Sequence, residues 1–287
     1  MHVLVAGAAG ALGREVTREL LSRGHRVRAL VNRTTLPEDL HDKVGVHRAD
    51  ATHLDELRGV ADGIDAVFSC LGASVSPRMS RGRRTFHQVD TPANLNLIAA
   101  AREAGAGHFV YVSVAGHEEL GHLRYVQAHE AVVAALRGSP LSYAVIRPSG
   151  FFSAFSEFLR MAEKGTVTII GDGSARTNPV HDRDLAAVCA DAVEGTRGER
   201  AVGGPEVLSR REIAELAFLA LGKPGRIRSV SPSALRTIAP LVRPLNPRAG
   251  DLIAFVAEVF TQDLVVPACG SRTLAAYFDD VASRSGR

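Results

Sequence analysis

Three glycines near the start of the chain have the spacing of a loop that could hold phosphate groups. Gly7, Gly10 and Gly13 lie three residues apart, where the apolar run Val3–Ala8 gives way to a helical pattern. Glycine lets a strand turn directly into a helix, lets backbone approach a ligand closely, and lets the helix pack tightly on the strand. The helix then offers unpaired N–H groups and a partial positive charge to a diphosphate. The motif predicts a dinucleotide site, and a tight turn without a ligand is the alternative.

The residues after the second apolar run indicate which dinucleotide is preferred. A site for NAD usually places an acidic residue about 20 positions beyond the turn, where it binds the ribose 2′-hydroxyl. Here Asn32 and Arg33 occupy that place. Asn32 cannot repel a 2′-phosphate, and the Arg33 guanidinium can form two hydrogen bonds with one. Arg14 could add a second positive charge or could be a solvated helix residue. We therefore predict NADP(H) in preference to NAD(H).

Short apolar runs alternate with helical patterns through the first half of the chain. The runs are rich in Val, Leu, Ile and Phe, which is typical of strands buried on both faces of a parallel sheet. Such an alternation predicts an α/β fold with a doubly wound parallel sheet, the Rossmann fold. The predicted strands are Val3–Ala8, Val27–Val31, Val44–His47, Ala66–Leu71, Phe109–Ser113 and Tyr143–Arg147.

The second half is less regular, and it contains no internal repeat and no break that resembles a linker. We therefore predict two parts: a dinucleotide-binding Rossmann domain over residues 1–150, and a smaller C-terminal substrate lobe over residues 151–287 that folds against the sheet. A stretch punctuated by proline, Pro232 to Pro247, precedes one or two last helices. Helical or extended patterns before it cover Phe151–Glu163, Thr166–Ile170, Asp184–Val193 and Arg211–Leu221.

Composition narrows the class of protein. The 287 residues are 46% hydrophobic and 23% charged, which is typical of a globular chain, and a net charge of +3 is too small to suggest nucleic acid. Three separated cysteines do not form a disulfide framework, and no metal-ligand motif is present. We find neither a signal peptide nor an apolar stretch of ~18 residues. We expect a cytoplasmic monomer or homodimer with a small-molecule substrate, no metal, no nucleic acid and no membrane partner.

Taken together, several segments resemble the short-chain dehydrogenase/reductase superfamily in its atypical and extended branch, and NmrA-like proteins in particular. The glycine motif, GAAGALG, has the spacing GxxGxxG of that superfamily. The resemblance covers about residues 1–225. The other segments that carry it are, in chain order, Ala49–Thr52, Cys70–Ala73, Tyr111–Ser113, Arg147–Phe152, Asn178–His181 and Asp184–Ala186.

The resemblance implies which residues surround the cofactor. Segments after the third, fourth and sixth strands would lie beside the adenine, the ribose and the nicotinamide. Together with the glycine turn and its arginines, the predicted cofactor contacts are Gly7, Ala9, Gly10, Ala11, Leu12, Gly13, Arg14, Arg33, Asp50, Ala51, Leu71, Gly72, Ala73, Ser113, His129, Pro148 and Gly150.

The resemblance also implies catalytic residues. In that family a tyrosine donates the proton while the cofactor delivers hydride, a serine orients the carbonyl, and a lysine four residues after the tyrosine lowers the tyrosine pKa. Ser113 and Tyr125 match the serine and the tyrosine, but His129 occupies the lysine position. A histidine with a pKa of about 6.5 is mostly neutral at pH 7. Reduction, which needs only a proton donor, would therefore suffer less than oxidation.

We predict an NADPH-dependent atypical short-chain reductase that acts on a carbonyl or activated double bond of a small apolar or aromatic metabolite. Tyr125 would donate the proton, Ser113 would orient the oxygen, and His129 would hold the ribose. A surface role for Tyr125 and a packing role for His129 are the plainer interpretations. A non-catalytic redox sensor of NmrA type that binds NADP(H), favoured by the missing lysine, is the main alternative. An isomerase or epimerase that uses bound cofactor transiently is a third.

Two clusters allow both a functional and a structural interpretation. Phe151, Phe155 and Phe158 share a helical face that suits either a hydrophobic core or an aromatic substrate wall. The second cluster is an arginine-rich loop, which suits either a basic lid for an anionic substrate or a solvated surface. Its arginines are Arg78, Arg81, Arg83 and Arg84.

Overall fold

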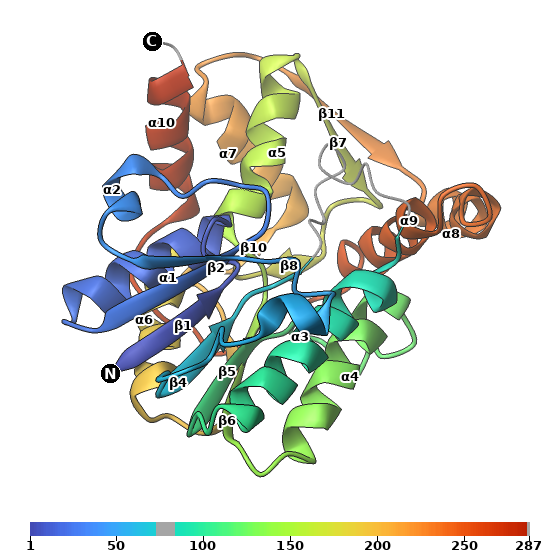
Figure 1. Ribbon diagram of the computed structural model, residues 1–287. Coiled ribbons are helices and arrows are strands. Elements are labelled where there is room, and N and C mark those ends of the chain that lie inside the picture. The colour runs from blue at the N-terminus through green and yellow to red at the C-terminus, as the bar shows by residue number, and fades with distance from the viewer. Residues whose placement is uncertain (73–83, 286–287) are drawn as a thin grey trace.

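A seven-stranded parallel sheet lies at the centre of the computed structural model, which describes residues 1–72 and 84–285 (Figure 1). The strand order β3-β2-β1-β4-β5-β6-β9 reverses direction at β1, which confirms the predicted doubly wound sheet. The strands are β1 (His2–Ala6), β2 (Arg26–Val31), β3 (Gly45–Arg48), β4 (Ala66–Ser69), β5 (His108–Val112), β6 (Ser142–Pro148) and β9 (Gly198–Val202).

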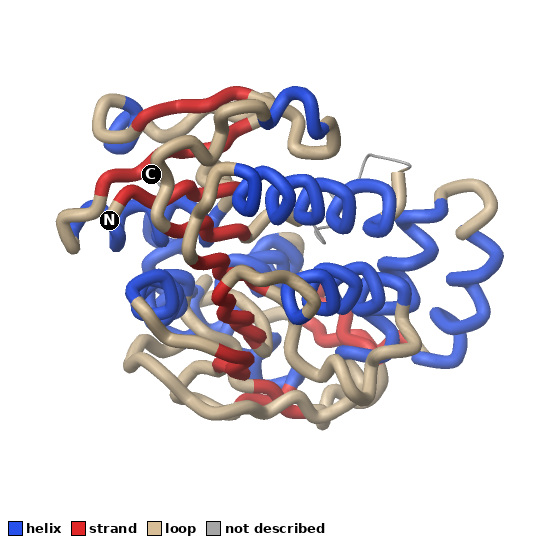
Figure 2. Tube along the Cα trace, turned by 60° about the horizontal axis from the view of Figure 1, so that its bottom comes forward, coloured by secondary structure: helices blue, strands red, loops and turns tan. Residues whose placement is uncertain are grey.

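Strand β1 shows why the predicted runs are apolar throughout. Val3 and Val5 face one layer of the core, whereas Leu4 and Ala6 face the other, and all four are fully buried. Helices therefore cover both faces of the sheet (Figure 2). On the first face these helices are α1 (Ala11–Ser22) and α6 (Asp182–Glu194), and on the second they are α3 (Phe86–Glu103) and α4 (Arg124–Arg137).

Several elements that follow β6 build a smaller layer beyond the carboxyl ends of the strands (Figure 1). Phe155 and Phe158 lie in its hydrophobic core, whereas Phe151 packs against the core of the main sheet. In this layer β7 and β11 form a parallel pair. The elements are α5 (Phe152–Glu163), β7 (Thr166–Ile170), α7 (Arg210–Ala220), β11 (Arg226–Val230) and α10 (Leu274–Ser285).

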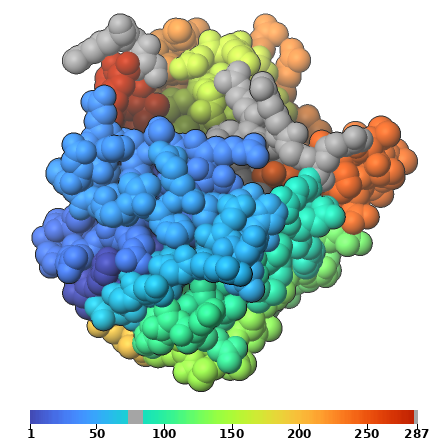
Figure 3. Space-filling view, in the orientation of Figure 1, coloured from blue at the N-terminus to red at the C-terminus, as the bar shows by residue number. Residues whose placement is uncertain are grey.

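Two further helices form a projection at one side of the molecule, visible in orange in Figure 3. They are α8 (Pro232–Val242) and α9 (Pro247–Val259), and α9 packs against α4. Both begin with a proline in their first turn, as the proline-punctuated sequence suggests. In the parts of the chain that the structure describes, every helix is too short or too polar to cross a membrane.

The chain returns to the first sheet after residue 150. Helix α6 packs on α1, and β9 pairs with β6 as the edge strand of the main sheet. Four of the five β9 residues are exposed or half-buried, so this strand lacks the apolar run that reveals the central ones. The division into a Rossmann domain and a substrate lobe at residue 150 stays a prediction. The remaining short elements are α2 (Glu38–His41), η1 (Leu54–Leu57), β8 (Arg176–Thr177) and β10 (Leu208–Ser209).

Candidate functional site

The glycine turn connects β1 to α1 by close backbone contacts. Gly7 has φ +90°, a value that favours glycine, and its carbonyl oxygen accepts a hydrogen bond from the Gly10 N–H at 2.9 Å. A Cβ atom at Gly13 would lie 2.1 Å from the Gly7 oxygen. The first and third glycines are therefore required by the turn itself, as the sequence predicts.

The amino end of α1 is open to a ligand. Gly10 is the N-cap and supplies no side-chain hydrogen bond, and the first turn contains no acidic residue. The Arg14 Nε atom donates to the Ala9 carbonyl at 2.8 Å, which holds this cation against the turn. The turn also lies where the strand order reverses between β1 and β4, the usual place for a ligand in such a sheet. This arrangement fits a pyrophosphate.

Strand β4 ends beside the same turn. A Cβ atom at Gly7 would lie 3.0 Å from the Cys70 sulfur, so this side chain packs closely against the turn. Burial raises the pKa of the Cys70 thiol to about 12, which keeps the thiol protonated at neutral pH. The Leu71 carbonyl accepts from Asn94, and Gly72 lies next to the Asp90 carboxyl group. Among the other predicted residues, Ala73, Arg78, Arg81 and Arg83 lie outside the described residues.

The predicted adenine end of the site lies past β2 and β3. Arg33 is exposed and makes no ion pair within residues 1–72 and 84–285, so its guanidinium is available to an anion. The Asp50 carboxylate accepts two hydrogen bonds from Thr52, at 2.9 and 2.8 Å. Burial alone would raise the Asp50 pKa, but these bonds outweigh it and the pKa is lowered. The Ala51 carbonyl accepts from Asn96.

Ser113 belongs to a buried ion network. It lies directly after β5, and its Oγ accepts from Arg147 Nη1 at 3.2 Å. Arg147 is 2% exposed and binds Glu130 of α4 at 2.6 Å and Glu199 of β9 at 2.8 Å. The hydroxyl hydrogen of Ser113 is left to donate to another group. The sequence singles out Arg147 only as part of a motif, because the two glutamates lie far away along the chain.

Tyr125 packs in an aromatic cluster on α4. Its ring centroid lies 4.8 Å from that of Phe86, 4.4 Å from that of Phe255 and 4.8 Å from that of His129. Burial raises the Tyr125 pKa, so the phenol keeps its proton at physiological pH. Within the described residues no hydrogen bond joins Tyr125 to Ser113.

His129 is buried and pairs with a tyrosine that the sequence does not reveal. The His129 Nδ1 atom lies 2.7 Å from the hydroxyl oxygen of Tyr111 on β5. Burial lowers the His129 pKa to about 4, so the imidazole is neutral at pH 7. Its Nε2 atom has no hydrogen-bond partner in the described part of the chain. A buried polar atom without a partner fits a contact with a ligand.

The turn after β6 is held by backbone and side-chain contacts. Pro148 is the last residue of β6, and the Ser149 hydroxyl donates to the Asn178 carbonyl at 2.6 Å. A Cβ atom at Gly150 would lie 3.1 Å from the Phe155 ring. His181 accepts from the Arg183 N–H and so caps α6.

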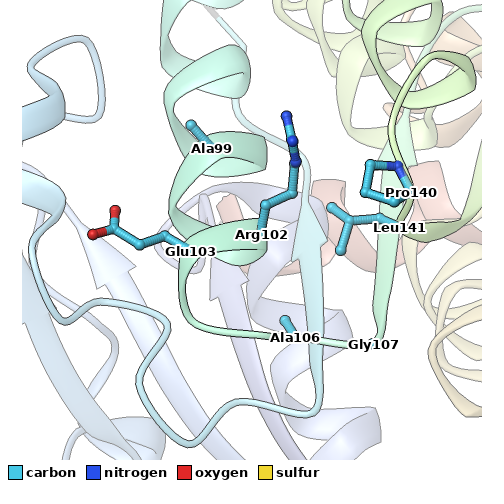
Figure 4. A pocket seen from close by; sticks show the side chains of 7 residues that line it. All are labelled: Ala99, Arg102, Glu103, Ala106, Gly107, Pro140 and Leu141. Atoms are coloured by element: carbon cyan, nitrogen blue, oxygen red, sulfur yellow. The ribbon is translucent and has the colours of Figure 1, made fainter.

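A hollow of about 580 Å³ lies at the other edge of the sheet (Figure 4). Ala106 and Gly107 precede β5, and Leu141 precedes β6, so the hollow faces the amino ends of these strands. The glycine turn follows the carboxyl end of β1, so the hollow and the turn cannot belong to one binding site. A second hollow of about 200 Å³ includes Gly116 and Leu120, just past the carboxyl end of β5. Residues 1–72 and 84–285 contain no cluster of His, Cys, Asp and Glu that could hold a metal ion.

Comparison with known proteins identifies the family to which this chain belongs. Residues 7–196 match the NAD(P)H-binding family. The chain is 29% identical over 245 residues to the chloroplastic divinyl chlorophyllide a 8-vinyl-reductase of Cucumis sativus, with 77% of this chain and 57% of that protein aligned. The chain thus spans less than two thirds of this relative.

A bacterial relative is matched more completely. The (4-alkanoyl-5-oxo-2,5-dihydrofuran-3-yl)methyl phosphate reductase of Streptomyces griseus is 31% identical over 242 residues, which cover 82% of this chain and 79% of that enzyme. Among solved structures, the triphenylmethane reductase of Citrobacter sp. complexed with NADP(H) superimposes with a TM-score of 0.75. It is 20% identical and covers 98% of this chain and 100% of that one, which shows a shared fold.

Proposed function

This chain belongs to the NAD(P)H-binding family, in the atypical branch of the short-chain dehydrogenase/reductases, and from that premise we propose that it is an NADPH-dependent reductase. Its substrate is a carbonyl compound or an activated double bond of a small apolar or aromatic metabolite. The observation that carries the proposal is the open glycine turn at the end of β1, together with Arg33 just past β2, which makes no ion pair among the described residues. A cytoplasmic location and a monomeric or homodimeric state stay predictions.

Residues of the glycine turn, the segment after β2 and helix α4 each bind a different part of the cofactor. The N–H groups of the first turn of α1 bind the pyrophosphate, and Arg14 adds positive charge from the same end. Arg33 binds the 2′-phosphate. His129 offers a ribose hydroxyl its Nε2 atom, which has no hydrogen-bond partner among the described residues. The nicotinamide supplies a hydride when the cofactor is bound.

The protonation states favour reduction. Tyr125 stays protonated because burial raises its pKa, and the neutral His129 does not counteract this. Tyr125 is therefore a proton donor and a poor base. Ser113 accepts from Arg147 and keeps its own hydrogen for the substrate oxygen. An isomerase or epimerase also needs a base, so this geometry supports it less.

We expect turnover to depend on the Tyr125 hydroxyl. Purified protein with NADPH and a panel of ketones, quinones and enones is followed at the nicotinamide absorbance. Tyr125→Phe should lower kcat by about 100-fold or more, the usual contribution of a positioned acid, with NADPH affinity unchanged. Tyr143→Phe, the same change on β6, should leave kcat unaltered. Equal rates in wild type and Tyr125→Phe would remove Tyr125 from the mechanism.

A redox sensor is the second candidate. The specific observation in its favour is the neutral His129 at the position where the family's lysine lowers the tyrosine pKa. A sensor binds NADPH tightly and turns over none of the panel, whereas a reductase turns over at least one compound.

We expect Arg33 to set the cofactor preference. Arg33→Gln should weaken NADPH binding by about 10- to 100-fold, because a charged hydrogen bond to the 2′-phosphate is lost, and should leave NADH binding unchanged. Arg14→Gln is the matched control, since a residue beside the pyrophosphate should affect both nucleotides alike. Titration calorimetry measures all six affinities, those of wild type and the two variants for NADPH and NADH. An equal loss for NADPH and NADH in Arg33→Gln would place the 2′-phosphate elsewhere.

A further inference from the structure

Arg210 is a buried cation in the layer beyond the sheet. It is the first residue of α7 and is 2% exposed. Its guanidinium carbon lies 4.8 Å from the centroid of the Phe260 ring and 5.9 Å from that of Phe155. Its Nη2 atom donates to the Val259 carbonyl, in the last turn of α9, at 2.9 Å. The side chain is thus held at a fixed place between two aromatic rings.

The hydrogen-bonding capacity of Arg210 is largely unused. Its Nε and Nη1 atoms are buried and have no partner in the part of the chain that the structure describes. It makes no ion pair among those residues; Asp263 acts on it electrostatically, but that carboxylate accepts the Arg176 N–H. Burial lowers the Arg210 pKa to about 10, which leaves the group charged at neutral pH. A buried cation without a counter-ion is costly, and a bound anion would relieve that cost.

The position of Arg210 connects it to the proposed active site. Phe155, one of its two flanking rings, lies next to Gly150, in the turn after β6 that is predicted to contact the nicotinamide. Only one side chain therefore separates Arg210 from that turn. Because the guanidinium has almost no exposed surface, an anion can reach it only if the Phe155 or Phe260 ring moves.

We propose that Arg210 binds an anionic group, a carboxylate or a phosphate, of the substrate whose carbonyl or double bond is reduced. The proposal rests on the reductase function above and makes it more specific. The substrate is then amphipathic: its apolar body lies against the Phe155 and Phe260 rings, and its charged end replaces the missing partners of Nε and Nη1. The same contact excludes neutral analogues, because they would leave the cation buried and unpaired.

The test compares a charged substrate with its neutral counterpart. For wild type we expect a higher kcat/KM for an oxoalkanoate than for its methyl ester, by about 10- to 100-fold, the usual range for a charge-assisted contact. Arg210→Gln should abolish this preference by lowering kcat/KM for the acid and sparing the ester. Arg211→Gln, the neighbouring exposed arginine that donates to the Asp172 carbonyl, is the matched control and should keep the preference. An oxoalkyl phosphate of equal length distinguishes phosphate from carboxylate.

Each outcome decides the proposal. It is overturned if wild type treats acid, phosphate and ester alike, or if Arg210→Gln lowers kcat/KM equally for all three. If none of the three is reduced, the reductase function fails for these carbonyls, and direct binding decides about Arg210. Decanoate titrated into the NADPH-saturated protein should then bind wild type and Arg211→Gln but not Arg210→Gln. Equal binding to all three proteins, or to none, contradicts the anion site.

Discussion

Gly13→Ala should lose measurable NADPH binding and unfold at a lower temperature than the wild type. The new Cβ atom would lie 2.1 Å from the Gly7 oxygen and 2.9 Å from the Ala8 Cα atom. Both contacts are with backbone, so the turn between β1 and α1 must open. Forced overpacking of this kind costs about 1–3 kcal/mol. The same movement displaces the N–H groups that we propose bind the pyrophosphate, so binding should be affected more severely than folding.

A second glycine variant separates the two effects. At Gly10 a Cβ atom would lie 3.2 Å from the Gly7 oxygen, and the φ angle of −75° suits any residue. Gly10→Ala should therefore fold with nearly wild-type stability and still weaken NADPH binding, because a methyl group now projects where the phosphates approach. Gly107→Ala, at the opposite edge of the sheet, should change neither property. Thermal unfolding with and without NADPH measures both, and normal NADPH binding by Gly13→Ala would contradict the assignment of this turn.

Arg147→Met should destabilise the protein by about 1–3 kcal/mol, because the carboxylates that lose this partner are partly exposed and Glu199 keeps its pair with Arg137. Arg147 is buried, and its removal leaves the carboxylates of Glu130 and Glu199 without their shared partner. It also removes the donor to Ser113 Oγ. Methionine conserves much of the side-chain volume, so the decrease in unfolding free energy reflects the loss of the guanidinium charge and its hydrogen bonds. Arg236→Met, which breaks a more exposed pair with Glu258, should cost less than about 1 kcal/mol in the same urea titration. Equal losses in the two variants would show that the buried network contributes no special stability.

The decrease in the free energy of unfolding caused by Arg147→Met should depend on pH. Burial raises the Glu199 pKa, but hydrogen bonds from Arg147 and Arg137 outweigh it, so the folded pKa lies below the ordinary value of 4.5. A carboxyl group with a lowered pKa adds stability above its unfolded pKa, and that stability is lost as the pH falls through the folded value. The difference between wild type and Arg147→Met should therefore be full at pH 7 and shrink below about pH 4.5.

The sheet could be predicted from the sequence because its central strands are buried on both faces. Runs such as Ala66–Leu71 are apolar at nearly every position, and the observed strand β4 covers four of those six residues. Strand β9 could not be found in this way, since an edge strand with one neighbour needs few apolar residues. Helix α3 begins at Phe86, and its first turn is fixed by the Thr85 capping box rather than by apolar periodicity.

The candidate site was predictable where a local motif creates it and not where distant residues meet. The glycine turn is set within seven residues, and its observed contacts are those that the spacing requires. The pairing of His129 with Tyr111 depends on packing between α4 and β5, and the contact of Ser113 with Arg147 depends on strand register. Arg210 has no sequence signature. Its Nε and Nη1 atoms lack a hydrogen-bond partner among the described residues because of side chains that pack around it from distant parts of the chain.

The most direct test of the central claim is a calorimetric titration of the pure protein with NADPH and NADH. The glycine turn and Arg33, which has no ion-pair partner in the part of the chain that the structure describes, predict that NADPH binds with one site per chain and more tightly than NADH. If neither nucleotide binds at millimolar concentration, the turn is not a dinucleotide site, and both the reductase and the sensor are excluded.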